Sequence, residues 1–411
     1  MEQTATATPL LRSRPLLALL GAETLSTTGS QMTWLALPWF VLITTGSPKQ
    51  MAFVATAEAG GYALSGLPSG SLLARLGSQR TMRLCDGVRA PLILLVPVLH
   101  WTGELSFPVL LALTFAVGVA SPPYGAAQRI VVADVLDEDE ALVERANALL
   151  QGATRITMLL GPALAGVLIA VVGAPPVLLA DAVSYVVSFA LVTLFVPVAG
   201  APPAEADAEV DAGGLLAGVR YLLHDTLLRG WTSAIVVGDA AFTVLFVAIP
   251  VLVVAHYGRD PRLAGAFLAS WGVGAVIGNV IAYRSERIGG LRLASWLVLA
   301  QAAPLWTLAT PVPAAAIGAA LALSGVANGL VNPTLHAFLT LRPPAALRAK
   351  TLTATFTAST LGAPLALAVA GPAFVAFGSR HVLAGAAAAQ SAAMVYASFV
   401  TLRYLKRTAA A

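Results

Sequence analysis

The sequence predicts an all-α membrane protein with twelve transmembrane helices, arranged as two six-helix halves that are pseudo-symmetric repeats. Composition is the first reason. Of the 411 residues, 58% are hydrophobic and only 11% are charged, whereas soluble domains carry about 25% charged residues. The second reason is the length of the apolar runs, because a helix needs about 20 residues to cross a bilayer. The runs lack the alternation of strands, so we expect helices.

The apolar runs set the order of the elements. The expected spans lie at about 15–43, 50–73, 83–102, 107–128, 146–172, 175–197, 231–255, 263–283, 291–310, 313–335, 350–376 and 382–402. Basic residues gather in alternate connections, from Arg75 and Arg80 in the first to Arg348 and Lys350 in the last. Since cytoplasmic loops carry an excess of Lys and Arg, this pattern predicts a plasma-membrane protein with both termini in the cytoplasm.

One polar stretch divides the chain. Residues 199–214 are rich in Pro, Glu and Asp, which predicts a flexible linker between a six-helix bundle at 1–198 and another at 231–411. Leucines then recur at helical spacing between Leu215 and Leu227, opposite Arg220 and His224. We interpret this part of the 199–230 linker as an amphipathic helix at the membrane interface, with an early start of the seventh span as the alternative.

The two halves resemble each other in sequence. Leu35-Ala-Leu-Pro38 aligns with Val247-Ala-Ile-Pro250, and Gly70 at the end of the second span aligns with Gly278 at the end of the eighth. Gly161-Pro-Ala-Leu-Ala165 is similar to Gly362-Ala-Pro-Leu-Ala366. Correspondences at a near-constant offset indicate that the halves arose by duplication.

The connection after the second span carries a recognisable motif. It reads Gly70-Ser-Leu-Leu-Ala-Arg-Leu-Gly77, followed by Arg80. This segment resembles the loop between the second and third helices of the major facilitator superfamily, Gly-x-Leu-Ala-Asp-Arg-x-Gly-Arg-Arg. Gly70, Arg75 and Gly77 match in register, whereas Ala74 stands where the family has Asp, and Arg80 comes one place late. The resemblance implies two parallel six-helix repeats that rock around a central cavity.

A second motif lies in the fifth span. Gly161-Pro162-Ala-Leu-Ala-Gly166 is similar to the Gly-Pro motif of the antiporters and exporters of this superfamily, and the surrounding region resembles its siderophore-exporter and macrolide-efflux branch. Small residues let helices approach closely, and Pro162 bends its helix. The motif therefore favours a gating role, with ordinary helix packing as the alternative.

Charged residues inside the spans are the candidates for coupling to protons, because each costs at least about 2.5 kcal/mol at the bilayer centre. Glu23, Arg155 and Asp239 lie at similar depths in the first, fifth and seventh spans. The resemblance implies that these spans line or flank the cavity. We therefore expect a Glu23–Arg155 pair with Asp239 opposite, either as a proton carrier or as a static ion pair. Glu58 is a further protonation site or an outer-gate partner.

Two more acidic residues suggest a structural role. Asp86 and Arg89 are three residues apart and share a helix face, so we expect them to brace the loop at Gly70 in place of the missing Asp. Asp181 is interpreted as a group that hydrogen-bonds one helix to another.

Uncharged polar and aromatic residues are the candidates for substrate contact. Gln151, Asn328 and Asn332 lie in the fifth and tenth spans, and Asn328 and Asn332 share a face. Interhelical hydrogen bonds are the alternative use of these groups. Trp34 is a candidate for an apolar cavity wall, with anchoring at the interface as its alternative.

The sequence also argues against other functions. It has no phosphate-binding loop and no nucleophile elbow, and its one cysteine and scattered histidines offer no metal site. We therefore expect no enzyme, no cofactor and no nucleic-acid partner. The expected function is efflux of lipophilic or amphiphilic small molecules (a drug, natural product or siderophore) by a monomeric bacterial antiporter driven by the proton gradient. An importer of the same fold is the first alternative, followed by a membrane-embedded enzyme and a non-transporting sensor.

Overall fold

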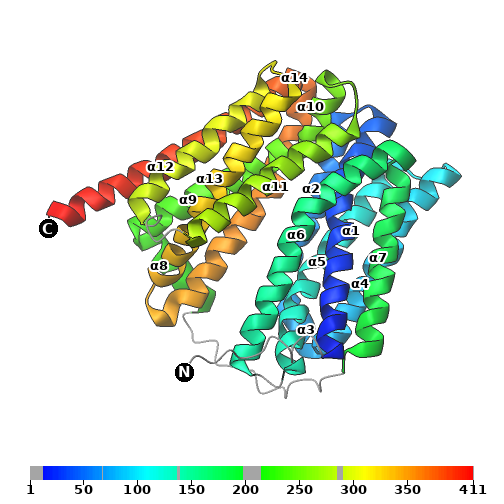
Figure 1. Ribbon diagram of the computed structural model, residues 1–411, viewed down its shortest axis with the longest axis horizontal. Helices are drawn as coiled ribbons and strands as arrows, with labels where there is room; N and C mark the ends of the chain where they lie inside the picture. The colour runs from blue at the N-terminus through cyan, green and yellow to red at the C-terminus, as the bar shows by residue number, and fades with distance from the viewer. Residues whose placement is uncertain (1–12, 67, 137–138, 198–213, 285–289, 411) are drawn as a thin grey trace. The chain divides into compact units, whose positions relative to one another are not determined.

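The computed structural model describes residues 13–66, 68–136, 139–197, 214–284 and 290–410, and these are almost entirely helical (Figure 1). The elements, in chain order, are α1 (Arg14–Thr45), α2 (Pro48–Ser65), α3 (Ser69–Leu76), α4 (Ser78–Thr102), α5 (Phe107–Val135), α6 (Glu140–Val172), α7 (Ala174–Phe195), α8 (Gly214–His224), α9 (Thr226–Val247), α10 (Ile249–His256), α11 (Pro261–Arg284), α12 (Leu291–Ala302), the 3-10 helix η2 (Ala303–Ala309), α13 (Ala314–Leu341), the 3-10 helix η3 (Ala345–Leu347) and α14 (Arg348–Ala410).

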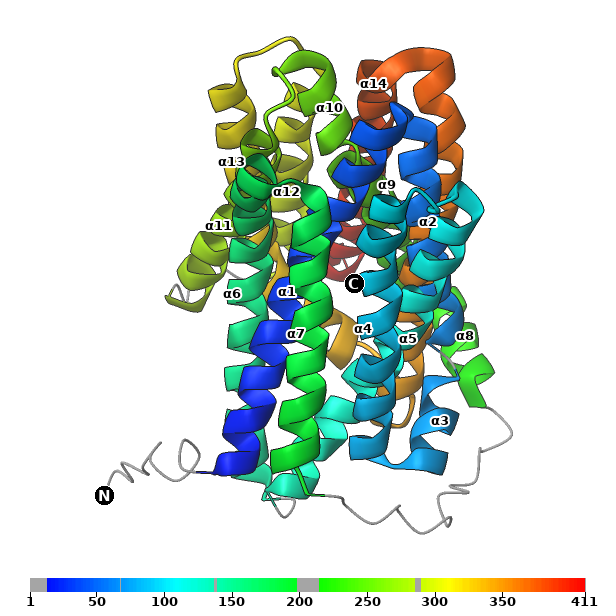
Figure 2. The same ribbon diagram turned by 90° about the vertical axis from the view of Figure 1, so that its right-hand side faces the viewer.

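The chain forms two compact units. Unit 1 comprises residues 1–40 and 57–207, and unit 2 comprises residues 41–56 and 208–411. Within unit 1, α4 packs against both α5 and α7, and within unit 2, α11 packs against α13 (Figures 1 and 2). The described helices confirm the all-α fold class.

The helix ends correct the expected spans 50–73 and 231–255. The stretch 50–73 is two helices, because the chain turns between Ser65 and Ser69, where Gly66 and Pro68 disfavour a helix. The stretch 231–255 is also interrupted, at Ala248, just before Pro250. The last two spans share the label α14, but they are two helices that meet at a kink at Gly378, whose φ of 77° suits glycine, so their separation agrees with the prediction.

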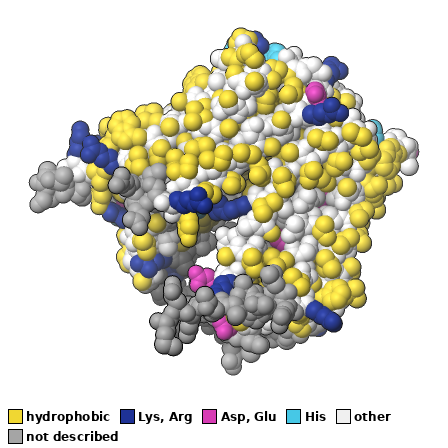
Figure 3. Space-filling view, in the orientation of Figure 1, with side chains coloured by type: hydrophobic (Ala, Val, Ile, Leu, Met, Phe, Trp, Pro, Cys, Tyr) yellow, Lys and Arg dark blue, Asp and Glu magenta, His cyan; other side chains and the backbone are white. Residues whose placement is uncertain are grey.

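Several described helices are long and apolar enough to cross a membrane. These segments are Phe107–Val135, Leu142–Val172, Ala174–Phe195, Thr226–His256, Pro261–Arg284, Ala314–Leu341 and Lys350–Arg407. The last of them has 58 residues, which is length for two crossings at about 20 residues each. Hydrophobic side chains are spread over much of the face shown in Figure 3. The total of twelve spans stays a prediction.

Both units use glycine to bring two helices into backbone contact. In unit 1, a Cβ added to Gly61 or Gly118 would overlap the backbone of the other helix of the α2–α5 pair. In unit 2, α11 and α13 meet in the same way at Gly274, Gly278 and Gly325. Small residues at a helix interface permit this close approach. The second and fourth expected spans of each half therefore share one packing mode, which agrees with the predicted duplication.

A short helix precedes the first long helix of unit 2. The structure confirms a separate helix, α8, which ends at His224 before the side chain of Asp225 accepts hydrogen bonds from the backbone N–H groups of Leu227 and Leu228 and caps α9. Its place at the membrane interface stays a prediction. The acidic stretch 199–213 lies outside the described residues.

Candidate functional site: buried polar clusters in the two units

The most polar part of unit 1 is an ion pair inside the helix bundle. Arg89 Nη2 lies 2.5 Å from Asp86 Oδ1, and both side chains are buried. The guanidinium lies 4.4 Å from the ring centres of both Tyr124 and Tyr185, so two cation–π contacts enclose it. The other oxygen of Asp86 accepts a hydrogen bond of 2.6 Å from the hydroxyl of Ser188. We call these five residues the arginine cluster.

A second buried carboxylate lies next to the arginine cluster. The hydroxyl of Thr33 on α1 donates to Asp181 Oδ2 on α7 at 2.5 Å, which confirms Asp181 as a helix-to-helix hydrogen-bonding group. Tyr185, one turn further along α7, shares a hydrogen bond of 2.8 Å with Ser30 on α1. Partly buried Glu58 faces the same region from α2. Among the described residues, neither Asp181 nor Glu58 has a Lys or Arg partner within 4 Å.

The expected pair of Glu23 with Arg155 does not form in the structure. Buried Glu23 instead accepts hydrogen bonds from the side-chain amide of Gln128 at 2.6 Å and from the hydroxyl of Thr154 at 3.0 Å. Thr154 immediately precedes Arg155, whose side chain points to the exposed side of α6. The predicted depth is correct, because Glu23 contacts the turn of α6 that contains Arg155. Within that turn, Thr154 points toward Glu23 and Arg155 points away from it.

The role expected for Asp86 and Arg89 is also corrected. They pair as their spacing predicts, but they face the tyrosines of α5 and α7 rather than the loop at Gly70. The start of α4 is held instead by Ser78, which donates to Asp134 at 2.9 Å, and by Gln79, whose amide donates to the carbonyl of Val196 at 2.6 Å. The loop is therefore braced by neighbouring helix ends.

The residues of the two motifs lie in unit 1. Gly70, Arg75 and Arg80 are exposed, and most of the predicted basic turn is the helix α3. Gly77 has a φ of 80°, which the turn between α3 and α4 requires. Gly161, Pro162 and Gly166 are buried, and a Cβ at Gly161 would overlap Gln31 of α1. The motif therefore closes the α1–α6 contact, while its gating role stays a prediction.

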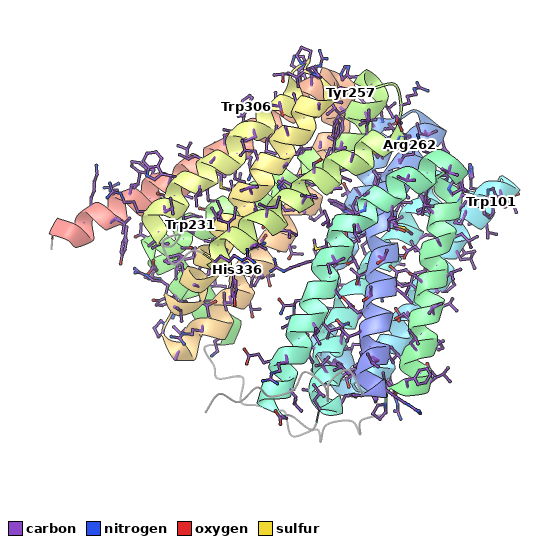
Figure 4. All side chains as sticks on the ribbon, in the orientation of Figure 1. Trp101, Trp231, Tyr257, Arg262, Trp306 and His336 are labelled. Atoms are coloured by element: carbon purple, nitrogen blue, oxygen red, sulfur yellow. The ribbon has the colours of Figure 1, made fainter. Side chains whose placement is uncertain are left out.

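Unit 2 contains a pocket of about 260 Å³ between α9, α11, α12, α13 and α14. Its polar groups include Asp239 and both predicted asparagines, and Asn332 donates to Asn328 at 3.0 Å across one turn of α13. Trp231, labelled in Figure 4, forms part of the wall, and its indole N–H is bonded to Thr401 at 2.9 Å. The structure thus places Asp239, Asn328 and Asn332 around one pocket.

Two polar pocket residues, Gln301 on α12 and Gln390 on α14, were missed by sequence reasoning, and Gln390 has only 2% of its surface exposed. Trp271 on α11, a predicted candidate for an apolar cavity wall, does line the pocket, with its ring centre 5.1 Å from that of Phe242. The signal for Gln390 was present, since it is a polar residue in the apolar run 382–402. Gln151 is exposed on α6 and Trp34 is 39% exposed on α1, and neither lines this pocket.

One ion pair outside the predicted spans connects the start of α9 to the end of α13. Arg342 Nε donates to Asp225 at 2.9 Å, and Arg342 Nη1 donates to the hydroxyl of Tyr404 at 2.7 Å. Burial acts to lower the pKa of Arg342, but the hydrogen bonds to Tyr404 and Asp225 outweigh it and raise the pKa, so the residue stays charged. In the part of the chain that the structure describes, no three His, Cys, Asp or Glu side chains gather as metal ligands.

Comparison with known proteins places this geometry in context. The family model of the Major Facilitator Superfamily matches residues 19–367. The chain is 25% identical over 374 residues to the multidrug efflux pump Tap of Mycolicibacterium fortuitum, covering 87% of this chain and 88% of that protein. It is also 25% identical over 372 residues to Tap of Mycobacterium tuberculosis, covering 87% and 86% of the two chains.

Solved structures show the same fold at lower sequence identity. A mutant of the nucleoside transporter NupG superimposes with a TM-score of 0.75 at 11% identity, covering 94% of this chain and 99% of that one. A bacterial homologue of the human lysosomal transporter Spinster, in an inward-facing and unoccupied conformation, gives a TM-score of 0.73 at 13% identity, covering 98% and 99%. These likenesses concern the fold alone.

Proposed function

The chain belongs to the major facilitator superfamily and is a membrane transporter, and we propose that it exports lipophilic or amphiphilic small molecules in exchange for protons. The direction is supported by its relatives, which are named multidrug efflux pumps and match along nearly the whole chain. Export from the cytoplasm would make it an antiporter of the plasma membrane. This reading favours export over the import that the fold also permits.

The observation that carries proton coupling is the imbalance of buried charge in unit 1. The buried ionisable side chains there include three carboxylates, Glu23, Asp86 and Asp181, and one cation, Arg89. A buried charge needs a partner, and an unpaired carboxyl group in an apolar bundle is far cheaper in its neutral form. A carboxyl group of this kind can therefore take up a proton inside the bundle and release it when water reaches it.

Asp181 is the best placed of them to exchange a proton. Its hydrogen bonds come from Thr33 and Ser184, which can satisfy either protonation state, whereas Asp86 is fixed by Arg89. Glu23 and Glu58 remain candidates for proton exchange. The groups that donate hydrogen bonds to Glu23 are neutral, and the charged neighbour of Glu58 is the acidic Asp181. Arg155 has no ion-pair partner among the described residues and is not needed for this scheme.

Transport is tested by the retention of fluorescent lipophilic dyes and antibiotics in cells expressing the chain. We expect lower retention than in cells with an empty vector, and the difference disappears when a protonophore collapses the gradient. Proteoliposomes then give the driving force directly, since an imposed pH gradient alone should drive dye movement. Dye movement that follows the membrane potential and ignores the pH gradient would contradict proton exchange.

A further inference from the structure

The pocket in unit 2 has the chemistry of a ligand site, and the following inference, which names a substrate class, rests on the proposed efflux function. It lies within a single unit and has side chains from five helices in its wall. Its volume of about 260 Å³ is slightly below the about 300–1,000 Å³ of sites that enclose a whole small molecule. The pocket therefore suits one end of a larger substrate.

Two polar atoms in the pocket wall are buried without partners. Among the described residues, neither Gln390 Oε1 nor Trp271 Nε1 makes a hydrogen bond. The amide of Gln390 lies against Gly238 of α9, where an added Cβ would come within 3.4 Å of Oε1. A buried polar atom without a hydrogen-bond partner costs about 1–3 kcal/mol. A bound ligand that donates a hydrogen bond to Gln390 Oε1 and accepts one from Trp271 Nε1 would remove this cost for both atoms.

The charge of the pocket selects a cation. Among the described residues that line the pocket, Asp239, which follows Gly238, is the one ionisable residue, and the hydroxyl of Ser359 donates to its carboxylate. Its exposed side chain marks the mouth of the pocket. One turn along α9, Phe242 packs beside Trp271, and the Trp271 ring also lies 5.5 Å from Phe246. Aromatic faces attract organic cations.

We propose that this pocket binds the ring-bearing, cationic end of an exported substrate. The cation lies near Asp239, the ring packs on Phe242 and Trp271, and a polar hydrogen of the ligand is donated to Gln390 Oε1. The indole N–H of Trp271 donates to an oxygen or nitrogen of the same ligand when one is within reach. Asn328 and Asn332 already satisfy one another in part and form the neutral polar floor.

Binding of two permanently charged probes to the purified full-length chain tests this arrangement. Ethidium is a flat aromatic cation with N–H donors, whereas tetraphenylphosphonium is an aromatic cation with none. We expect Asp239→Asn to weaken both probes about tenfold. Gln390→Leu should weaken ethidium about fivefold to tenfold, the worth of one hydrogen bond, and change tetraphenylphosphonium less than twofold.

The control is Ser391→Ala, the next residue on α14, which bonds Trp306 and does not line the pocket. Wild-type protein that binds neither probe overturns the proposal, since the cavity then holds only water. Equal losses for the two probes in Gln390→Leu overturn the role of its amide. If Gln390→Leu does not fold, Gln390→Met serves instead, because methionine is close to glutamine in length and volume and also lacks the amide. Ethidium binding should again weaken about fivefold to tenfold, and equal losses for the two probes contradict the assignment.

These binding measurements need no gradient and no transport. Wild-type binding that depends on Gln390 and Asp239, in a protein that moves no dye, would refute the proposed efflux and leave the site. Proton-driven efflux with probe binding that ignores both residues would refute the site and leave the function.

Discussion

The two units handle polar groups in opposite ways. Unit 1 buries three carboxylates and an arginine in a packed interior, whereas the buried polar residues described in unit 2 are uncharged. Unit 2 instead encloses a pocket with amides, aromatic rings and one carboxylate at its mouth. Both units are built on the same glycine-mediated helix contacts. Two units with the same packing device can thus place buried ionisable groups in one and a pocket lined mostly by uncharged polar and aromatic groups in the other.

The comparison suggests a division of labour. Buried charges inside a bundle require tight hydrogen bonding, which suits the binding and release of protons. A pocket with a single carboxylate and otherwise uncharged walls tolerates different cationic guests, because it imposes few charges that a guest must match. The following predictions test whether the two units are as different as this reading requires.

The largest effect is expected from removal of the buried cation. Arg89→Met leaves Asp86 buried and unpaired, which costs about 3–5 kcal/mol, so the thermal midpoint in detergent should fall steeply or the protein should not accumulate. The double variant Asp86→Asn/Arg89→Met should recover much of this loss. In unit 2, Asp239→Asn should leave the midpoint nearly unchanged, and a comparable fall there would break the comparison.

Asp181→Asn tests proton handling. The amide still accepts the hydrogen bond from Thr33 but cannot exchange a proton, so we expect efflux driven by a pH gradient to fall about a hundredfold, the smallest contribution typical of a positioned proton-transfer group. Ethidium binding to the purified variant should stay within twofold of wild type. The control is Asp260→Asn, in the connection before α11. Undiminished gradient-driven efflux would assign coupling to Glu23, Glu58 or Asp239 instead.

Both units bring two helices together at glycines, so we expect substitution of these glycines to lower stability by similar amounts in the two units. Gly118→Ala and Gly274→Ala each place a methyl group on a backbone carbonyl of the facing helix, at Glu58 and Ala322 respectively. We expect each to lower stability by about 1–3 kcal/mol in thermal unfolding. Gly60→Ala and Gly385→Ala are matched controls, since their added methyl groups meet no atom within 4 Å. A loss confined to one unit would show that the halves do not depend equally on this contact.

The smallest expected effect on stability comes from the side chains that hold a helix end in each unit. Unit 2 uses the partly exposed Arg342–Asp225 pair, so Arg342→Ala should cost about 1 kcal/mol, and less at high salt. Unit 1 uses the buried neutral amide of Gln79, and the cost of Gln79→Leu should not depend on salt. Thermal unfolding at low and high salt separates the two. Equal salt dependence would contradict the different chemistry of these ends.

The sequence by itself determined the fold class and the family. These follow from composition, run length and short motifs, which are local properties of the chain. It also gave the pairing of Asp86 with Arg89 and the shared face of Asn328 and Asn332, because helical spacing fixes which residues lie one turn apart.

Only the tertiary structure decided which groups meet across helices. Glu23 and Arg155 share a depth, but the direction of each side chain depends on helix rotation, which packing sets and periodicity along one helix does not. For the same reason, the tyrosines around Arg89, the partner of Asp181 and the unpaired amide oxygen of Gln390 could be identified only from the tertiary structure, which brings residues distant in sequence together.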